Sequence, residues 1–85
     1  MNTSNVRAPA AWRLPADDAA RFAAEGLHCD SRRCREPQAI VCWHRFWSKP
    51  AGRELLSERF LCEAHGAGFA RRHHIEIEDA PGGAQ

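Results

Sequence analysis

The sequence predicts a small α+β domain: a cysteine-bearing loop, a β-hairpin and a C-terminal helix, with a short helix in front. Three observations predict this arrangement. Two cysteines flank turn-forming residues in "CDSRRC" at 29–34. The β-branched and aromatic run "AIVCWHRFW" at 39–47 has the composition of a strand. Further along, ring-bearing and thiol side chains recur at helical spacing, at Cys62, His65, Phe69 and His73.

The two ends of the 85-residue chain differ from its middle. Residues 1–13 are expected to form a flexible arm, since their first eleven positions show no apolar period. Residues 14–78 are expected to form the domain, and the Pro- and Gly-containing residues 79–85 a disordered tail. A core of this size rarely supplies more than about 3–5 kcal/mol. The domain therefore needs disulfides, a metal ion or a partner to stay folded.

The N-terminal helix is expected over residues 15–27. Asp17 or Asp18 can cap its first turn, its alanines favour helix, and Gly26 stands where helices commonly stop. The cysteine-bearing stretch 28–38 then forms a loop.

The hairpin is expected to join the strand 39–47 to a shorter strand at 57–61 through a loop at 48–53, which contains Pro and Gly. Leu55 and Leu56 fit either a helical turn or an early start of the second strand. Alternation gives the first strand two faces, one with Ile40, Cys42, His44 and Phe46 and the other with Val41, Trp43, Arg45 and Trp47.

The last helix is expected over residues 62–74. Gly66 and Gly68 weaken it by about 1 kcal/mol each relative to alanine. The alternating segment 75–78 is expected to form a short strand or an extended tail.

Paired cysteine and histidine residues are the strongest functional signal. A tight turn can direct the thiols of Cys29 and Cys34 to one point, and the first turn of a helix can do the same for Cys62 and His65. Zinc takes four such ligands in a tetrahedron. The pattern predicts one structural zinc ion, worth about 10–16 kcal/mol of binding free energy in finger peptides. A site filled by four protein ligands has no position for a substrate, so we expect no enzymatic activity.

The order of knuckle, hairpin and helix resembles the treble-clef zinc finger, on the residues Cys29 and Cys34 of "CDSRRC" and Cys62 and His65 of "CEAH". It is similar in particular to small zinc-binding proteins of actinobacteria and their phages, in which a C-x4-C knuckle leads to an "LC-x2-H" helix. The commonest treble clefs have C-x2-C in the knuckle instead. The resemblance covers about residues 28–74 and implies a structural zinc and a binding role.

Other interpretations of these residues stay open. The four side chains could remain apart as reduced cysteines and a surface histidine, or the cysteines could form disulfides. Cys42 is the spare cysteine, expected as a small buried hydrophobe, with exchange into the site as its alternative. His28 and His44 are near enough in sequence to replace His65.

The surface suggests binding rather than catalysis. Arginines flank both halves of the metal pattern, at Arg32, Arg33, Arg71 and Arg72, and Trp47 could add a stacking platform. Such residues bind DNA or RNA, and the same types form protein interfaces. The net charge of +1 gives no overall attraction to nucleic acid. We expect a nucleic-acid-binding or regulatory finger, with a protein-interaction adaptor on a larger nucleic-acid-processing or transcription machine as the alternative.

Several classes are disfavoured. A nuclease of the His-Asn-His type needs an asparagine in the domain, whereas asparagine occurs only at positions 2 and 5. We expect no small-molecule substrate. No apolar stretch reaches the roughly 20 residues of a membrane span, and no secretory signal is evident, so a cytoplasmic, non-membrane protein is expected. That setting favours metal binding over disulfides.

Overall fold

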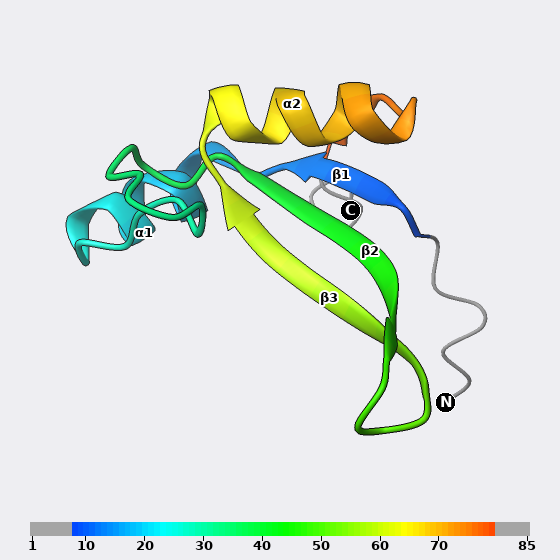
Figure 1. The fold of residues 1–85 in the computed structure, drawn as a ribbon. Helices are drawn as coiled ribbons and strands as arrows, with labels where there is room; N and C mark the ends of the chain where they lie inside the picture. The colour runs from blue at the N-terminus through cyan, green and yellow to red at the C-terminus, as the bar shows by residue number, and fades with distance from the viewer. Residues whose placement is uncertain (1–7, 80–85) are drawn as a thin grey trace.

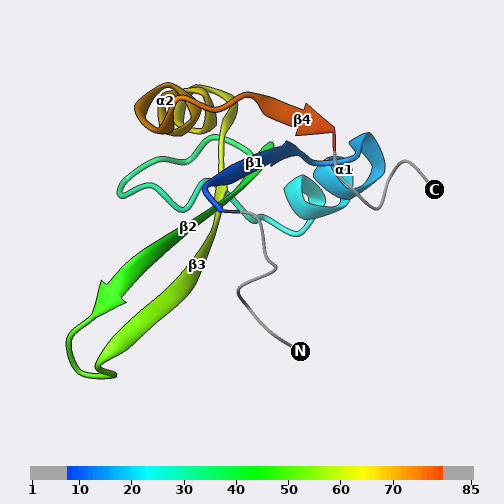
Figure 2. The ribbon, with the colours of Figure 1, turned by 90° about the vertical axis from the view of Figure 1, so that its right-hand side faces the viewer.

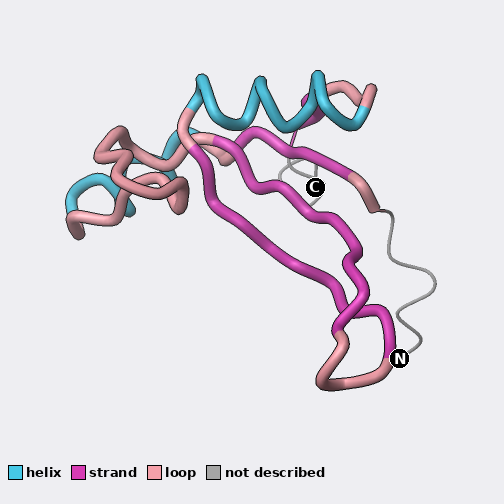
Figure 3. The backbone as a smooth tube through the Cα atoms, viewed as in Figure 1, coloured by secondary structure: helices cyan, strands magenta, loops and turns pink. Residues whose placement is uncertain are grey.

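Residues 8–79 are described by a computed structural model. They form a small α+β domain with one four-stranded sheet and two helices, in the order β1 (Ala10–Arg13), α1 (Ala16–Ala24), β2 (Ile40–Ser48), β3 (Arg53–Leu61), α2 (Glu63–His73) and β4 (Ile77–Asp79). The strand order across the sheet is β3-β2-β1-β4. Helix α2 lies along the sheet (Figure 1), while α1 and the cysteine-bearing loop lie together at one end (Figure 3).

The expected hairpin is present and longer than predicted. β2 and β3 pair antiparallel along their whole length, from Ile40 opposite Leu61 to Ser48 opposite Arg53. Leu55 and Leu56 therefore belong to the strand and not to a helical turn. The far end of this hairpin projects well beyond α2 (Figures 1 and 2).

The boundary predicted at residue 13 is wrong, because Ala10–Arg13 forms a strand inside the sheet. β1 pairs antiparallel with β2 and parallel with β4, so it fills the gap between them. Ala10 and Ala11 are buried there. Residues 1–7 of the predicted arm lie outside the described residues, as do residues 80–85 of the predicted tail, whereas Asp79 ends β4.

The two helices begin and end close to the predicted positions. α1 starts after Pro15, and neither Asp17 nor Asp18 caps it, since no side chain makes a capping hydrogen bond at its N-terminus. Gly26 follows its end with a φ of +80°, the left-handed conformation that glycine adopts without strain. α2 ends at His73, and the C-cap residue His74 takes the left-handed conformation.

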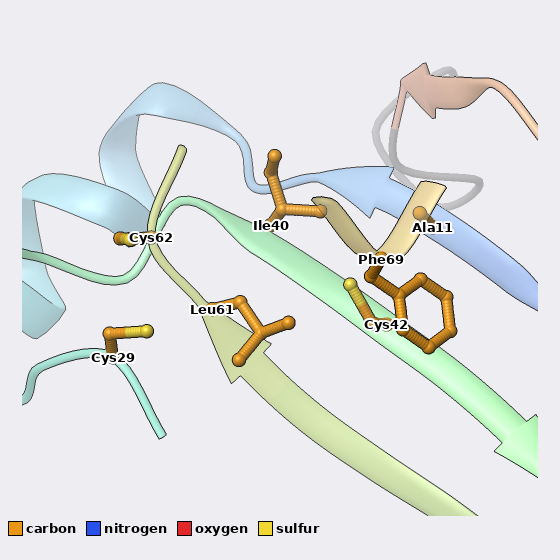
Figure 4. Packing of buried hydrophobic residues seen from close by; sticks show 7 residues of the cluster. All are labelled: Ala11, Cys29, Ile40, Cys42, Leu61, Cys62 and Phe69. Atoms are coloured by element: carbon orange, nitrogen blue, oxygen red, sulfur yellow. The ribbon is translucent and has the colours of Figure 1, made fainter. Parts of the chain in front are cut away.

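The core lies between the sheet and α2 (Figure 4). Its members are mostly small or branched: Ala11, Cys29, Ile40, Cys42, Leu61, Cys62 and Phe69. Cys29 and Cys62 lie at one end of this cluster, beside the cysteine-bearing loop, and Phe69 and Cys42 lie at the other (Figure 4). The end of the core with the two cysteines is where the predicted ligands meet.

Candidate metal centre

The first two candidate ligands belong to a tight loop, which we call the knuckle (residues 28–37). Its two ends approach each other at the bridge between His28 and Pro37, and the Cys29 N–H donates to the Glu36 carbonyl at 2.8 Å. Between them the Cys34 N–H donates to the Ser31 carbonyl at 3.0 Å. Arg33 turns the chain with a φ of +65°, a conformation that is uncommon for a residue with a side chain.

Asp30 attaches the knuckle to the edge of the sheet. Its carboxylate Oδ2 accepts a hydrogen bond from the Phe60 N–H at 2.7 Å, and its own N–H donates to the Phe60 carbonyl at 2.8 Å. Arg59 also donates from Nη2 to the Asp30 carbonyl at 3.4 Å. These bonds use edge groups of β3 that would otherwise face water, and they fix the knuckle beside the end of that strand.

The second pair of ligands lies where β3 passes into α2. Cys62 is the N-cap of α2, and its Sγ accepts a hydrogen bond from the His65 N–H at 3.4 Å. His65 is in the first turn, on the same side as Cys62. An N–H donor and the positive end of a helix both stabilise a thiolate at this position.

The structure brings all four predicted ligands together. The Sγ atoms of the three cysteines and a ring nitrogen of His65 lie within 4.8 Å of one another, and the group could hold one metal ion. No disulfide forms among the cysteines of the described residues, since all four are free thiols.

Three of the six ligand separations lie near the edges of a metal tetrahedron. With Zn–S near 2.3 Å and Zn–N near 2.05 Å, tetrahedral edges are about 3.8 Å for two sulfurs and about 3.6 Å for sulfur and nitrogen. Sγ of Cys34 lies 3.8 Å from Sγ of Cys62. Nδ1 of His65 lies 3.5 Å from Sγ of Cys29 and 3.2 Å from Sγ of Cys62. The donor set therefore fits a zinc-sized tetrahedral ion.

The electrostatics favour thiolate at Cys62. Desolvation acts to raise its pKa, but hydrogen bonds from the backbone and side chain of His65 and from the two knuckle thiols lower the pKa of Cys62 to about 7. At Cys34 the backbone N–H of Glu36 acts to lower the pKa, while desolvation and the thiols of Cys29 and Cys62 raise it on balance. The thiol of Cys62 therefore ionises more readily than the thiol of Cys34.

The alternative ligands lie outside the group. Cys42 is fully buried in the core, and burial raises the pKa of its thiol to about 11, so it is the buried hydrophobe that the strand pattern predicts. Nδ1 of His28 lies 3.2 Å from the Cys29 carbonyl, next to the site but outside the ligand cluster. His44 packs between Phe46 and Phe69, with ring centroids 6.2 and 6.0 Å away.

The arginines predicted for partner binding are all exposed, and one of them, Arg72, lines a cleft beside the metal centre. This cleft, of about 80 Å³, is lined by Ser31 of the knuckle, by Arg59, Leu61, His65 and Phe69, and by Arg72 of α2. Arg59 was not predicted as part of this surface. The alternation of side chains along the strand predicted at 57–61 places Arg59 on the same face as Leu61. This alternation is the sequence feature from which the position of Arg59 could have been predicted.

Trp47 lies elsewhere. It is 66% exposed on the projecting part of the hairpin. Its partner in the sheet is Glu54, and alternation along β2 places it on the face opposite Ile40 and Cys42, which α2 covers. The structure therefore separates Trp47 from the arginine-lined cleft.

Three further findings concern the helices, the origin of the ligands and the comparison with known proteins. No helix within residues 8–79 is long and apolar enough to cross a membrane. The site joins a knuckle, the end of a hairpin strand and the first turn of a helix, so its ligands come from segments more than 25 residues apart in the sequence. Comparison with known protein families, with curated proteins and with solved structures finds no match to this chain.

Proposed function

We propose that the cluster of Cys29, Cys34, Cys62 and His65 binds one structural zinc ion in a treble-clef-like finger. The observation that supports this is the clustering of the four ligand atoms within 4.8 Å, with three of their separations near the edges of a tetrahedron of three sulfurs and one nitrogen. The element order supports the treble-clef likeness, since a knuckle, a hairpin and a helix follow one another. β1 and β4 are additions to that plan.

A zinc ion held in this way would act as a cross-link and not as a catalyst. Four protein ligands complete the tetrahedron and leave no coordination position for water or substrate. The core that remains is small, with Phe69 as its one large aromatic member among the described residues. Metal binding would then supply much of the free energy of folding. We therefore propose a non-enzymatic protein.

The function that we propose for the finger is nucleic-acid binding through the end that carries the metal centre. Arg72 and Arg59 line the cleft with the hydroxyl-bearing Ser31, and the neighbouring Arg32, Arg33 and Arg71 are exposed. Guanidinium groups and a serine hydroxyl are the groups that contact phosphate oxygens. The metal would hold the knuckle against the first turn of α2, and so keep Ser31 of the knuckle beside the Arg72 side chain, which extends from the last turn of α2 into the same cleft.

A fluorescence-anisotropy titration at low salt, with duplex and single-stranded oligonucleotides, tests this function. Four phosphate contacts predict a slope of about −3 to −4 for log affinity against log salt concentration on duplex DNA. Replacing Arg32, Arg33, Arg71 and Arg72 by Gln should flatten that slope while the zinc content stays unchanged. The double variant Arg71→Gln/Arg72→Gln has a matched control in Lys49→Gln/Arg53→Gln, which removes the same charge from the hairpin end. Equal losses in both doubles, or no binding to either oligonucleotide, would contradict the proposal.

The second candidate function is a protein-interaction adaptor on a larger nucleic-acid-processing machine. The observation that favours it is the exposure of a large aromatic side chain on the projecting hairpin, where Trp47 is 66% exposed. Exposed tryptophan is enriched at protein interfaces, where it often dominates the binding energy.

A further inference from the structure

The sheet has two unlike faces. One face carries Ile40, Cys42 and Leu61, which are almost completely buried beneath α2. On the other face α1 contacts one end, where the rings of Phe22 and Phe60 pack edge to face with centroids 6.1 Å apart. We call this second face the tryptophan face, and define it by Trp12, Val41, Trp43, Arg45, Trp47, Glu54, Leu56, Glu58 and Glu78.

All three tryptophans of the sequence lie on this face. Trp12 and Trp43 come from neighbouring strands, with ring centroids 4.5 Å apart and planes at 86°. Both are half-buried, whereas Trp47 extends the row along the hairpin and is 66% exposed. Tryptophan that serves only as core would be expected beneath α2, where the buried side chains are instead small or aliphatic, apart from Phe69.

The charges beside these rings are mainly acidic. Glu54 and Glu58 are exposed, and Glu78 is partly exposed in β4. The Trp43 Nε1–H donates to the Glu58 carboxylate at 2.8 Å, which holds that carboxylate beside the rings. Among the described residues of the face, Arg45 is the one cation, and it is partly buried.

This charge pattern discriminates between occupants. A second copy of the chain would bring acidic groups against acidic groups, and a nucleic-acid strand would bring phosphates against them, so both are disfavoured. A polypeptide with Arg or Lys beside apolar side chains complements the face, because cations pair with carboxylates and also stack on indole rings.

We propose that the tryptophan face is a docking surface for a basic, apolar polypeptide segment of a partner protein. Trp47 is the anchor, and Glu54 and Glu58 select the positive charge. The surface is separate from the arginine-lined cleft on the metal-bearing end, so a protein partner and a nucleic acid could be bound together. The proposal does not depend on nucleic-acid binding, and it gives the adaptor function its surface and the chemistry of its partner.

The test uses the full chain with zinc and a panel of labelled synthetic peptides in which Arg or Lys alternates with Leu or Val. Matched peptides carry Glu in place of the basic residues. Binding is measured by anisotropy at about 0.15 M salt. Basic peptides should bind and acidic peptides should not. Trp47→Ala should weaken binding at least tenfold, and Glu54→Gln/Glu58→Gln should weaken it and reduce its salt dependence.

Two control variants separate this surface from others. Phe46→Ala removes an exposed aromatic ring from the opposite face of the same strand and should leave affinity unchanged. Arg71→Gln/Arg72→Gln, which weakens the proposed nucleic-acid binding, should also leave peptide affinity unchanged. Equal losses in Trp47→Ala and Phe46→Ala would overturn the proposal.

Other outcomes would also overturn it. They are equal binding of acidic and basic peptides, no binding of any peptide up to about 1 mM, a dimer in sedimentation analysis that Trp47→Ala dissociates, and single-stranded oligonucleotide binding that Trp47→Ala abolishes. If a chain lacking residues 1–7 binds the basic peptides and the full chain does not, the face belongs to the chain's own N-terminal segment, and the proposal fails.

Discussion

Gly66 of α2 lies directly against Ile40 of β2. A Cβ atom added at Gly66 would lie 2.5 Å from Cδ1 and 2.8 Å from Cβ of Ile40. Both distances are shorter than non-bonded carbon atoms normally allow. Ile40 is completely buried and cannot move aside without displacing its neighbours. The absence of a side chain at Gly66 therefore allows α2 to lie close to the sheet. This close approach fixes the position of Cys62 and His65, at the start of α2, relative to the knuckle.

Gly66→Ala should destabilise the domain by up to about 2 kcal/mol, because overpacking against Ile40 costs about 1–3 kcal/mol and outweighs the roughly 1 kcal/mol of improved helix propensity. Gly68→Ala is the matched control on the same helix. Its added Cβ would meet nothing nearer than the Arg71 guanidinium at 3.9 Å, so it should stabilise by about 0.5–1 kcal/mol. Chemical denaturation of both zinc-loaded variants measures the change in the free energy of unfolding, which should be negative for Gly66→Ala and positive for Gly68→Ala. A stabilised Gly66→Ala protein would refute the close contact with Ile40.

Removal of zinc should unfold the domain. Native mass spectrometry should find one zinc ion per chain, and a strong chelator should abolish the helix and strand signal in circular dichroism. Cys62→Ser should lose both metal and fold. Cys42→Ala should keep the zinc, since Cys42 lies in the core and outside the ligand group. A metal-free sample with unchanged secondary structure would contradict this expectation, as would a Cys42→Ala protein without zinc.

Asp30→Ala should loosen the knuckle from β3. The variant loses the carboxylate that accepts the Phe60 N–H at 2.7 Å, at a cost of about 1 kcal/mol. Zinc affinity should fall as well, because Cys29 and Cys34 would be less well positioned. Asp30→Asn retains an acceptor oxygen and should keep most of the stability. Competition with a chromogenic chelator gives the affinity, and equal behaviour of the two variants would show that this hydrogen bond does not position the ligands.

His73 should titrate below its ordinary pKa of 6.5. Desolvation by the surrounding chain lowers the pKa of His73, and the charges of His44, Arg72 and His74 lower it further. The unfolded chain then binds more protons than the folded one below pH 6.5. The contribution of His73 to stability is therefore complete above that pH and is lost as the pH falls to the folded-state pKa.

An NMR titration of the histidine ring protons measures this shift. Arg72→Gln should raise the pKa of His73, because it removes one of the positive charges nearby. Lys49→Gln, on the hairpin turn, removes the same charge at a distance and should leave it unchanged. A pKa of His73 at or above 6.5 in the zinc-loaded protein would show that the ring is better solvated than the packing indicates.

The ligands could be predicted from the sequence because their geometry is local. The pairs Cys29–Cys34 and Cys62–His65 each lie within a single turn, and a turn fixes side-chain directions over a few residues. The hairpin was predicted for a similar reason, since β2 is rich in β-branched and aromatic residues. The four-ligand cluster required only that these two local units meet.

The parts that could not be predicted depend on distant contacts. β1 has only four residues, "AAWR", too few to show an alternating pattern, and its place in the sheet depends on strands far along the chain. The role of Gly66 depends on Ile40 lying beneath it, whereas helix propensity alone marks the glycine as a weakness. The gathering of the three tryptophans on one face could not be predicted either, because Trp12 belongs to β1, a strand that the sequence pattern does not indicate.

The parallel pairing of β1 with β4 has a consequence for how the chain folds. The register of Ala11 with Ile77 joins the first described strand to the last, so this pair can form only after almost the entire intervening chain has closed into a loop. The β2–β3 hairpin and α2 have local contacts and can form early, whereas the other half of the sheet has to wait. Backbone amides of β4, on a three-residue edge strand, are thus expected to exchange with solvent sooner than those at the centre of β2. The domain would then open from the edge where its two ends meet, while the metal-bearing end stays closed.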